Sequence, residues 1–501
     1  MQTLAADLLI IGGGINGVGV AADAAGRGLS VILCEKDDLA SHTSSASSQL
    51  IHGGLRYLEH IEFKLVHEAL KEREILLHKA PYLVHPLTFV LPHDKHLRPA
   101  WMIRLGLFLY DYLARRESLK GAKRVNLRNV ELGKPLQEKF TTGFCYMDCQ
   151  TNDARLVVMN ALDAQARGAT ILTRTHCHSA KRQEGGWTIH LKNARLQEII
   201  VHAKAIVNAA GAWVSDVLEQ VTQTGTAASA SASASVRLIK GSHFVVPKWY
   251  PGNHAYILQN PDDRVVFVLP YQKEFNLIGT TDVPFEGDPN QVVISPEEIE
   301  YLLKSVNDYF SHPITTKDIV WRYAGVRSLY DDRSKKASEI TREYHLDLND
   351  EQGSAPILSI FGGKITTYRS LAEHVMTKLA RYFPNMTDTW TAKSKLPGGH
   401  LNGDSFANFV LTLEEQYPWA PKAMLRRYAG SYGDLTYKIL KNYNKLNELG
   451  KHFGADLYEA EVDYLIHNEW VQTCDDLIWR RSKLGLFLSK DEINVLRGEL
   501  E

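Results

Sequence analysis

The architecture of this protein follows from Leu8-Leu9-Ile10-Ile11-Gly12-Gly13-Gly14-Ile15-Asn16-Gly17. The apolar residues predict a buried strand, and the pattern G-x-G-x-x-G predicts a tight turn into a helix. Glycine lets the backbone N–H groups approach a pyrophosphate at the N-terminus of that helix. Glu35 ends the next predicted strand, where a carboxylate accepts hydrogen bonds from ribose hydroxyls. We therefore predict a dinucleotide-binding unit over residues 7–36.

A second glycine turn lies far along the chain, at Phe361-Gly362-Gly363-Lys364-Ile365-Thr366-Thr367-Tyr368. It brings amides, hydroxyls and a cation to the predicted start of a helix, which suits a phosphate or an electron-rich ring system. Between the two turns, Asn208-Ala209-Ala210-Gly211-Ala212-Trp213 ends a predicted strand and offers a further backbone approach. A long cofactor held at several places is FAD more often than NAD, so we predict FAD. The structural alternatives are an ordinary glycine turn, a strand end and a capped helix.

Composition and charge limit the partners. The chain has 57 basic and 58 acidic residues, so no overall field attracts nucleic acid and we expect none as a partner. Of the five cysteines only Cys145 and Cys149 lie close together, and C-x-x-x-C alone predicts neither a zinc site nor an iron–sulfur site. We therefore expect no metal, and reduced cysteines as in cytosolic proteins.

The 501 residues exceed one ordinary domain. The pattern predicts an α/β fold: a doubly wound FAD-binding (Rossmann-like) domain, a mixed β-sheet substrate domain and a C-terminal all-α domain. We also expect a long helix over 62–79 and a β-rich stretch over 236–330. The predicted segments are 1–80, 151–235 and 336–390 for the FAD-binding domain, 81–150 (with a membrane-facing helix) and 236–335 for the substrate domain, and 396–501 for the helical domain.

Longer motifs resemble those of a known family. Ser44-Ser45-Ala46-Ser47-Ser48-Gln49-Leu50-Ile51-His52-Gly53-Gly54-Leu55-Arg56-Tyr57 is similar to the flavin-covering loop of FAD-dependent glycerol-3-phosphate dehydrogenases of the bacterial aerobic, respiratory type. Gln49 departs from the family, which usually has lysine there, and the Ala/Ser-rich stretch 226–235 is atypical and predicts a flexible surface loop. The resemblance covers essentially the whole chain, through Leu97–Tyr110, Ile239–His243, Ile278–Asp282, Gly325–Arg327 and Phe361–Arg369.

The glycine motifs and this resemblance together imply a set of FAD-binding residues. They come from the first glycine turn, the end of the second strand, the flavin-covering loop and the two later glycine segments. The predicted FAD-binding residues are Gly12, Gly13, Gly14, Ile15, Asn16, Gly17, Glu35, Lys36, Thr43, Ser44, Ser45, Ser48, Leu50, Ile51, His52, Gly53, Gly54, Gly211, Trp213, Gly362, Gly363, Lys364, Ile365, Thr366 and Thr367. No flavinylation motif is evident, so we expect FAD to bind without a covalent link.

The resemblance implies oxidation of sn-glycerol 3-phosphate to dihydroxyacetone phosphate, so the site needs counter-charges for a dianion. Arg56, Arg327 and Lys364 each lie in a matching motif near glycine. Arginine suits phosphate because it can form two parallel hydrogen bonds. Any one of these residues alone is more often a surface salt-bridge partner, but three in matching motifs predict a phosphate clamp.

Oxidation of the C2 hydroxyl also needs a general base, whose pKa should lie near neutrality. His243 is the first candidate among the 20 histidines because of its motif, and His52 is the second. Lys364 is a third candidate if its pKa is lowered. Three further residues are expected to hydrogen-bond the substrate: Tyr57, Thr280 and Thr281.

The electron acceptor must reach the flavin, because no iron–sulfur cysteine set and no haem-attachment motif provides a second redox centre. In Leu97–Arg116 (LRPAWMIRLGLFLYDYLARR), apolar side chains recur at helical spacing among basic residues. We predict that this helix lies on the membrane surface and that electrons pass to ubiquinone or menaquinone. The alternative is an amphipathic helix whose apolar stripe packs on the core. The stripe consists of Trp101, Leu105, Phe108 and Tyr112.

Other functions share parts of this pattern. A flavin oxidase acting on an amine or amino acid would need one carboxylate clamp, and a glycerol-3-phosphate oxidase would use oxygen as acceptor. A nucleotide-binding regulatory or RNA-modification protein would need a basic face. An NAD-dependent dehydrogenase would leave the motif Phe361–Tyr368 unexplained.

The sequence also bears on location. No basic n-region precedes the first predicted strand, and no apolar run approaches the roughly 20 residues that cross a bilayer. We therefore expect a cytoplasmic protein, peripheral on the inner face of the cytoplasmic membrane. We also expect a homodimer.

Overall fold

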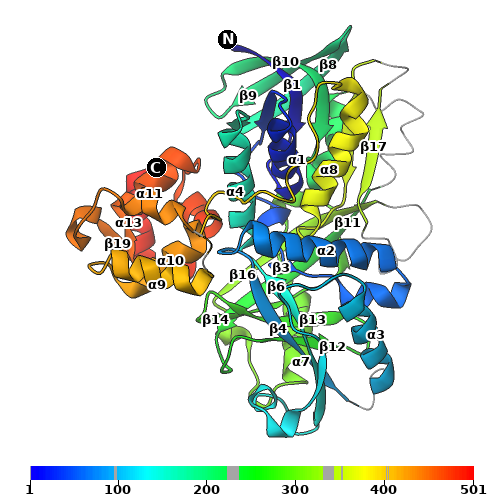
Figure 1. Ribbon diagram of the computed structural model, residues 1–501, viewed down its shortest axis with the longest axis vertical. Coiled ribbons are helices and arrows are strands. Elements are labelled where there is room, and N and C mark those ends of the chain that lie inside the picture. The colour runs from blue at the N-terminus through cyan, green and yellow to red at the C-terminus, as the bar shows by residue number, and fades with distance from the viewer. Residues whose placement is uncertain are drawn as a thin grey trace.

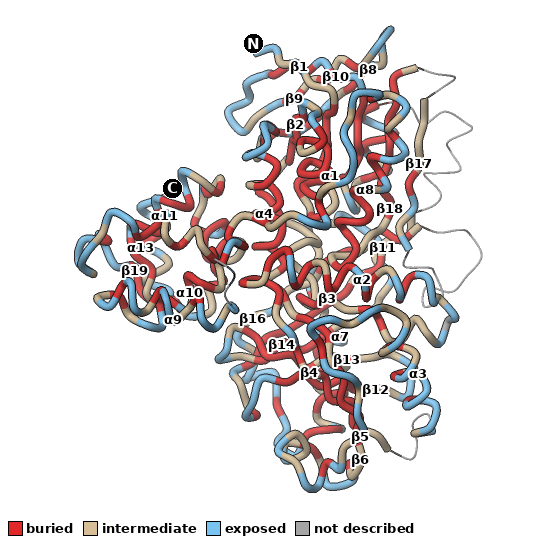
Figure 2. Tube along the Cα trace, in the orientation of Figure 1, coloured by how far each residue is buried: buried red, intermediate tan, exposed pale blue. Residues whose placement is uncertain are grey.

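The computed structural model describes residues 2–94, 99–222, 236–330, 343–350, 354–401, 403 and 405–501. The predicted loop 226–235 and residues Leu97 and Arg98 of the predicted membrane helix lie outside these ranges. Figure 1 shows an upper part with a sheet flanked by helices, a lower part built mainly of strands, and a helical unit beside them. Each part has buried residues in its interior (Figure 2).

The upper sheet carries the first glycine turn. Its strand order is β17-β18-β10-β1-β2-β7, and all neighbours on this path are parallel except β17 and β18. The hairpin β8–β9 is attached to β10. The strands are β1 (Gln2–Ile11), β2 (Val31–Cys34), β7 (Thr170–Leu172), β8 (Thr175–Gln183), β9 (Gly186–Asn193), β10 (Glu198–Asn208), β17 (His345–Asn349) and β18 (Ile357–Phe361).

Both faces of this sheet are covered, which explains the unbroken apolar run of β1. Leu8 and Ile10 pack with the helices on one face. Leu9 and Ile11 pack with the β8–β9 hairpin on the other face. A parallel sheet buried on both faces needs apolar residues at every position, and the predicted doubly wound α/β fold is confirmed. The helices of this part are α1 (Ile15–Gly26), α4 (Asp153–Ala166) and α8 (Tyr368–Leu379).

The lower sheet is mixed. Its main order is β15-β11-β14-β13-β12-β4-β6-β3, with β16 paired to β11 and β5 to β6. The expected β-rich stretch 236–330 is confirmed, but it also contains helix α7 (Pro296–Asn307), which we did not predict. The strands are β3 (Leu50–Ile51), β4 (His85–His93), β5 (Lys123–Asn126), β6 (Thr142–Gln150), β11 (Val236–Pro247), β12 (Ala255–Gln259), β13 (Val265–Tyr271), β14 (Phe275–Gly279), β15 (Val283–Pro284) and β16 (Trp321–Tyr330).

Two further helices flank the lower sheet. Helix α2 (Phe63–Lys79) runs between the two sheets and confirms the helix expected over 62–79 (Figure 1). Helix α3 (Ala100–Tyr112) lies at the outer side of the lower part. Among the described residues, no helix has both the length and the apolar character needed to cross a membrane.

The C-terminal helical unit (residues 405–501) has its own buried core. Its helical character was predicted and is confirmed, and a small hairpin of β19 (His452–Gly454) and β20 (Leu457–Tyr458) is present in addition. Its helices are α9 (Phe406–Gln416), α10 (Lys422–Tyr432), α11 (Leu435–Leu440), α12 (Glu459–Asn468) and α13 (Lys490–Leu500), together with the helical turn η11 (Asp476–Arg481).

Candidate active site

A cavity of about 350 Å³ opens at the carboxyl ends of β1 and β2, beside the first glycine turn. In open α/β sheets, ligands bind at this end of the strands. The hairpin β8–β9 closes one side through residues 175–178. The cavity is therefore a candidate site for the adenosine and pyrophosphate part of FAD. The predicted FAD-binding residues that line it are Gly12, Gly14, Glu35, Lys36, Thr43, Ser44, Gly211 and Trp213.

The first glycine turn requires glycine for steric reasons. Gly12 has a φ of +113°, and a Cβ there would lie 2.5 Å from the carbonyl oxygen of Ala209. A Cβ on Gly17 would lie 1.9 Å from the carbonyl oxygen of Gly12. At the start of α1, Gly14 provides no side-chain cap. The turn therefore forms a helix N-terminus of the kind that binds a pyrophosphate, and its Ile15 N–H donates to Ser44 Oγ of the flavin-covering loop (3.0 Å).

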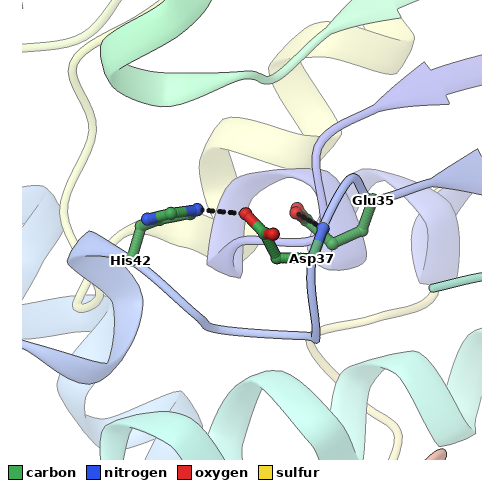
Figure 3. A group of neighbouring side chains, drawn as sticks. All are labelled: Glu35, Asp37 and His42. Carbon is green, nitrogen blue, oxygen red and sulfur yellow. Dashed lines mark hydrogen bonds and ion pairs between the residues drawn. The ribbon is translucent and has the colours of Figure 1, made fainter. Parts of the chain in front are cut away.

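Glu35 follows β2 and is buried beside this turn. Its carboxylate accepts hydrogen bonds from the backbone N–H groups of Gly13 (2.7 Å) and Asp37 (2.8 Å), and burial raises the pKa of Glu35. Figure 3 shows Glu35, Asp37 and His42 as neighbours, with His42 Nε2 2.8 Å from Asp37 Oδ2. That hydrogen bond lowers the pKa of Asp37.

The same three residues have the atom types of a metal site, with ligand atoms within 4.8 Å of one another. Both oxygens of Glu35 already accept backbone hydrogen bonds, however, and His42 is paired with Asp37. Glu35 also occupies the strand end at which an acidic residue accepts from ribose hydroxyls. We therefore assign this cluster to the nucleotide site.

Trp213 forms one wall of the cavity. Lys36 Nζ lies 3.7 Å from the centroid of its indole ring, as a cation–π contact. The ring of His42 contacts the same indole, with ring centroids 4.5 Å apart. The loop after β2 and the turn after β10 are thereby joined at the cavity wall, and the roles of Lys36 and Trp213 in FAD binding stay predictions.

The first and last glycine turns meet in space. Asn16 Nδ2 donates to the carbonyl oxygen of Gly362 (3.0 Å), 346 residues away in sequence. Gly363 has a φ of +103°, and a Cβ there would lie 2.7 Å from Asn16 Nδ2. Thr366 Oγ1 accepts from the backbone N–H of His52 (3.2 Å), which joins this turn to the flavin-covering loop. Asn16 Oδ1 is buried without a hydrogen-bond partner among the described residues, as expected where a ligand supplies one.

The flavin-covering loop is held by other elements along its length. Thr43 Oγ1 donates to the carbonyl oxygen of Val326 on β16 (2.6 Å). Leu50 and Ile51 form the buried strand β3, and the N–H of Gly53 donates to Tyr110 Oη on α3 (2.8 Å). The remaining predicted residues are direct sequence neighbours of the site residues described in this subsection. They are Ile15, Ser45, Gly54, Thr280, Ile365 and Thr367.

His243 lies on β11 and is almost fully buried. Its Nε2 is 2.8 Å from Ser48 Oγ, and its ring stacks on Tyr323 with centroids 4.9 Å apart. Burial, together with the positive charge of Arg327, lowers the pKa of His243 to about 3. The imidazole is therefore neutral, and its Nδ1 has no hydrogen-bond partner in the described part of the chain. We expected a base with a pKa near neutrality; the pKa of His243 is lower because burial and a nearby cation both disfavour the charged form.

This burial predicts an acid-sensitive contribution to stability. The pKa of His243 falls from 6.5 to about 3 on folding, so the unfolded state binds the extra proton between these values. The contribution is fully present above pH 6.5 and is lost as the pH falls toward 3, by at most about 1.4 kcal/mol per pH unit. We expect His243→Asn to flatten the fall in the free energy of unfolding over this range, measured by urea denaturation.

His312→Asn, at an exposed histidine, serves as the control and should keep the wild-type pH dependence. If His243→Asn and the unaltered protein lose stability with the same slope, the imidazole of His243 is not buried in its neutral form.

Arg327 lies on β16, next to β11. Its Nη2 is 2.5 Å from Asp282 Oδ1 and donates to the carbonyl oxygen of Thr281 (3.3 Å). Gly241 leaves the space that the guanidinium needs, because a Cβ there would lie 2.9 Å from Arg327 Nη2. A predicted clamp residue is thus held near the candidate base. Its partner Asp282 is one that we did not predict.

Lys364 and Tyr57 are brought together from distant motifs. Lys364 Nζ lies 4.0 Å from the centroid of the Tyr57 ring. The turn Leu55–His60 carries both Tyr57 and Arg56. Arg56 is half-buried, and no described residue forms an ion pair with it. Its place in a clamp with Arg327 stays a prediction.

Glu298 is a buried residue of this region that we did not predict. Its carboxylate accepts from Ser242 Oγ (2.9 Å) and Thr281 Oγ1 (2.7 Å), and it pairs with Lys240 Nζ (2.8 Å). The sequence signal was the capping box from Ser295 to Glu298 at the start of α7. Thr281 was expected to hydrogen-bond the substrate. Because its hydroxyl is buried and donates to Glu298, we correct its role to a structural one.

Helix α3 exposes the predicted apolar stripe. The helix packs on the core through the opposite face, so the alternative in which this stripe packs inward is wrong. The buried face consists of Ile103, Leu107 and Tyr110. The exposed side chains, each at least 50% accessible, are Trp101, Leu105, Phe108 and Tyr112.

Two protein-family models match the chain. Residues 7–369 match the family described as FAD dependent oxidoreductase. Residues 389–498 match the C-terminal domain of alpha-glycerophosphate oxidase. Together the two matches span both the sheets and the C-terminal helical unit.

Individual proteins are similar over nearly the whole chain. The glycerol-3-phosphate dehydrogenase of Pseudomonas aeruginosa is 51% identical, over 97% of this chain and 93% of its own. The D-erythritol 1-phosphate dehydrogenase of Brucella abortus is 48% identical, over 97% of this chain and 96% of its own. Among solved structures, the glycerol-3-phosphate dehydrogenase of Bacillus halodurans complexed with FAD has a TM-score of 0.77 at 26% identity, over 99% of this chain and 94% of that chain.

Proposed function

The chain belongs to the family of FAD-dependent oxidoreductases, and from this premise we propose that it oxidises sn-glycerol 3-phosphate to dihydroxyacetone phosphate and passes two electrons to a membrane quinone. The observation that supports this substrate is that the buried imidazole of His243 and the guanidinium of Arg327 lie on the paired strands β11 and β16. The first can accept a proton and the second can bind a phosphate dianion. The similarity to glycerol-3-phosphate dehydrogenases supports this choice.

The residues of the site fit FAD. Gly12–Gly17 and Glu35 would hold the pyrophosphate and the ribose at the cavity. The flavin-covering loop, with Lys364 and Thr366, would surround the ring system. When bound, FAD supplies the acceptor for the two electrons of the reaction.

The reaction breaks the C2–H and O–H bonds of a secondary alcohol. Bound FAD would accept the C2 hydrogen with its electron pair, while the hydroxyl hydrogen leaves as a proton and a C=O bond forms. We assign the proton to His243, whose ring is oriented by Ser48, and keep His52 as the second candidate. The substrate is a dianion, so its binding would raise the pKa of His243 and make the imidazole a stronger base.

A second phosphorylated polyol is a candidate substrate, because a D-erythritol 1-phosphate dehydrogenase is nearly as similar. Either compound offers a phosphate and an oxidisable hydroxyl. The test is the visible absorbance of oxidised flavin in the anaerobic protein, before and after addition of each compound. Bleaching by glycerol 3-phosphate at the lower concentration supports the proposal, and bleaching only by erythritol phosphate reassigns the substrate.

If neither compound bleaches the flavin, the polyol phosphates are excluded and an amine or amino acid becomes the candidate substrate. A separate assay addresses the acceptor. Hydrogen peroxide formed in air at the rate of substrate oxidation would indicate an oxidase, whereas reduction of an added quinone without peroxide supports the dehydrogenase.

We further propose that α3 lies on the inner face of the cytoplasmic membrane, where ubiquinone or menaquinone accepts the electrons. The exposed aromatic stripe and the surrounding basic residues support this, because such helices lie at the bilayer interface. Tyr110, on the buried face of α3, accepts from the N–H of Gly53 (2.8 Å), so the surface helix and the flavin-covering loop are directly joined.

We also propose that the protein is a homodimer, which sedimentation would test.

Replacing both Trp101 and Phe108 by serine is expected to weaken binding to phospholipid vesicles about 100-fold, because two large apolar side chains no longer enter the interface. Cosedimentation with vesicles containing anionic lipid measures this. Anaerobic reduction by substrate should be unchanged, since these side chains are 66% and 55% exposed in the protein.

The matched control replaces two exposed apolar residues elsewhere, Leu196 and Val293, each 71% exposed, by serine. An equal loss of vesicle binding in this control, or unchanged binding of the α3 variant, would mean that α3 is not the membrane surface.

A further inference from the structure

Two arginines of the C-terminal helical unit donate hydrogen bonds to one carboxylate of the FAD-binding part, that of Asp38. Arg481 donates two parallel hydrogen bonds to Asp38, from Nη1 to Oδ2 and from Nη2 to Oδ1, both 2.8 Å. Arg480 Nε adds a third, at 2.6 Å to Asp38 Oδ2. Arg481 and Asp38 are almost inaccessible to solvent. A bidentate fork of this kind fixes orientation as well as distance.

Asp38 belongs to the segment 37–49, here called the cofactor loop, which runs along the predicted FAD site. The backbone N–H of Asp38 donates to Ser41 Oγ (3.0 Å), and this hydroxyl donates to the carbonyl oxygen of Asp38 (2.7 Å). Ser41 and Thr43 then line the cavity. Asp38, which the C-terminal unit binds, therefore stabilises the turn that leads into the cavity-lining residues Ser41 and Thr43.

The other end of the cofactor loop is anchored on Asp153, at the start of α4. Ser47 donates to Asp153 Oδ2 through its N–H (3.1 Å) and its hydroxyl (2.8 Å), and Gln49 Nε2 donates to Oδ1 (3.1 Å). Lys483 of the C-terminal unit is also buried; burial lowers the pKa of Lys483, and the negative charge of Asp153 opposes this shift. This explains Gln49 as well: its amide faces Asp153, away from the cavity lining.

The two units are also aligned by ion pairs on either side. Arg155 of α4 donates from Nη2 to Glu469 Oε1 (3.0 Å), and both side chains are fully buried. Arg174 pairs with Asp476 of η11 (2.7 Å), while its backbone N–H donates to the carbonyl oxygen of Asp37 in the cofactor loop (2.7 Å). Buried ion pairs contribute little net stability but are costly to break singly, so they specify one docked arrangement.

We propose that Arg481 is a positioning residue for the cofactor: the C-terminal helical unit supports the cofactor loop from the side opposite the cavity, and FAD binding and docking of this unit are energetically coupled. The inference rests on the FAD dependence of the family and not on the choice of substrate. Coupling is reciprocal, so FAD must stabilise the docked unit by the same factor by which docking tightens FAD binding.

The first test is the dissociation constant of FAD in the full-length protein, measured by flavin fluorescence on reconstitution. Arg481→Met keeps the aliphatic stem and removes the fork, and we expect it to weaken FAD binding roughly 10-fold to 100-fold. Arg497→Met, which removes an exposed pair with Asp475 in the same unit, is the matched control and should bind FAD as the unaltered protein does.

The second test needs no variant and decides the matter if Arg481→Met does not fold. Hydrogen–deuterium exchange is compared in the unaltered full chain with FAD bound and after FAD removal. We expect FAD to slow exchange in peptides covering 476–486 as well as in those covering 37–49. Slowing confined to 37–49, or an FAD affinity of Arg481→Met equal to that of Arg497→Met, would overturn the coupling. Neither readout involves substrate, so a wrong substrate assignment would leave both results unchanged.

Discussion

Gly17→Ala is expected to yield a folded protein that no longer retains FAD. The added Cβ would lie 1.9 Å from the carbonyl oxygen of Gly12. That oxygen is a backbone atom of the turn itself, so the clash can be relieved only by moving the N–H groups away from the pyrophosphate site. We expect the dissociation constant of FAD to rise about 100-fold, which corresponds to the upper range of overpacking strain. The ratio of flavin to protein absorbance after gel filtration measures the loss.

Gly430→Ala is the matched control for this substitution. It adds the same methyl group to a glycine in α10, where no other atom lies within 4 Å. It should purify with the FAD content of the unaltered protein. If Gly17→Ala retains FAD equally well, the first glycine turn is not the pyrophosphate site and the adenosine end of the cofactor must lie elsewhere.

Arg327→Met is expected to raise the Michaelis constant for glycerol 3-phosphate by roughly 100-fold to 1000-fold. The loss of one partner from a hydrogen-bonded charge pair in a binding site costs about 2–5 kcal/mol. Here the phosphate would lose a bidentate donor and would also face Asp282, the carboxylate that Arg327 now neutralises at 2.5 Å. The measurement is the initial rate of substrate oxidation, with an added quinone as electron acceptor, as a function of the glycerol 3-phosphate concentration.

Two further variants test whether the rise in the Michaelis constant is due to the lost contact between Arg327 and the substrate phosphate. Arg327→Lys should recover only part of the affinity, because lysine restores the charge but not the planar fork. Arg264→Met, at an exposed arginine paired with Asp262, should leave the Michaelis constant unchanged. An Arg327→Met protein with unaltered affinity for the substrate would remove Arg327 from the proposed clamp.

Helix α3 shows what a periodic pattern can and cannot reveal. The spacing from Trp101 to Tyr112 predicted an amphipathic helix, and α3 confirms it. The spacing alone did not distinguish a stripe that faces the core from one that faces outward, because both faces of such a helix contain apolar residues. The outward orientation that we predicted is the one observed. Tyr110 and Leu107 had the same apolar character but are the buried ones. Packing against the rest of the lower part decided between the faces.

The polar core of the candidate active site was the least predictable part. The motif of His243 marked it as a candidate, but neither its contact with Ser48 nor its low pKa follows from the local sequence. The pKa depends on burial and on Arg327, which approaches from another strand. Thr281 was misassigned for the same reason, since its partner Glu298 lies on a helix that we did not predict.

Local motifs were sufficient to predict those parts of the structure that depend only on neighbouring residues. The turn from Gly12 to Gly17 and the strand before it could be predicted because backbone sterics and the burial of both sheet faces leave few other residues possible there. The contacts of Asn16 with Gly362 and of Arg481 with Asp38 join residues 346 and 443 positions apart. Such pairs depend on how the sheets and the helical unit pack, and a hydrogen bond is made or lost within a fraction of an ångström. The cofactor was therefore evident from the chain alone, whereas the charge pairs that shape its site required the tertiary structure.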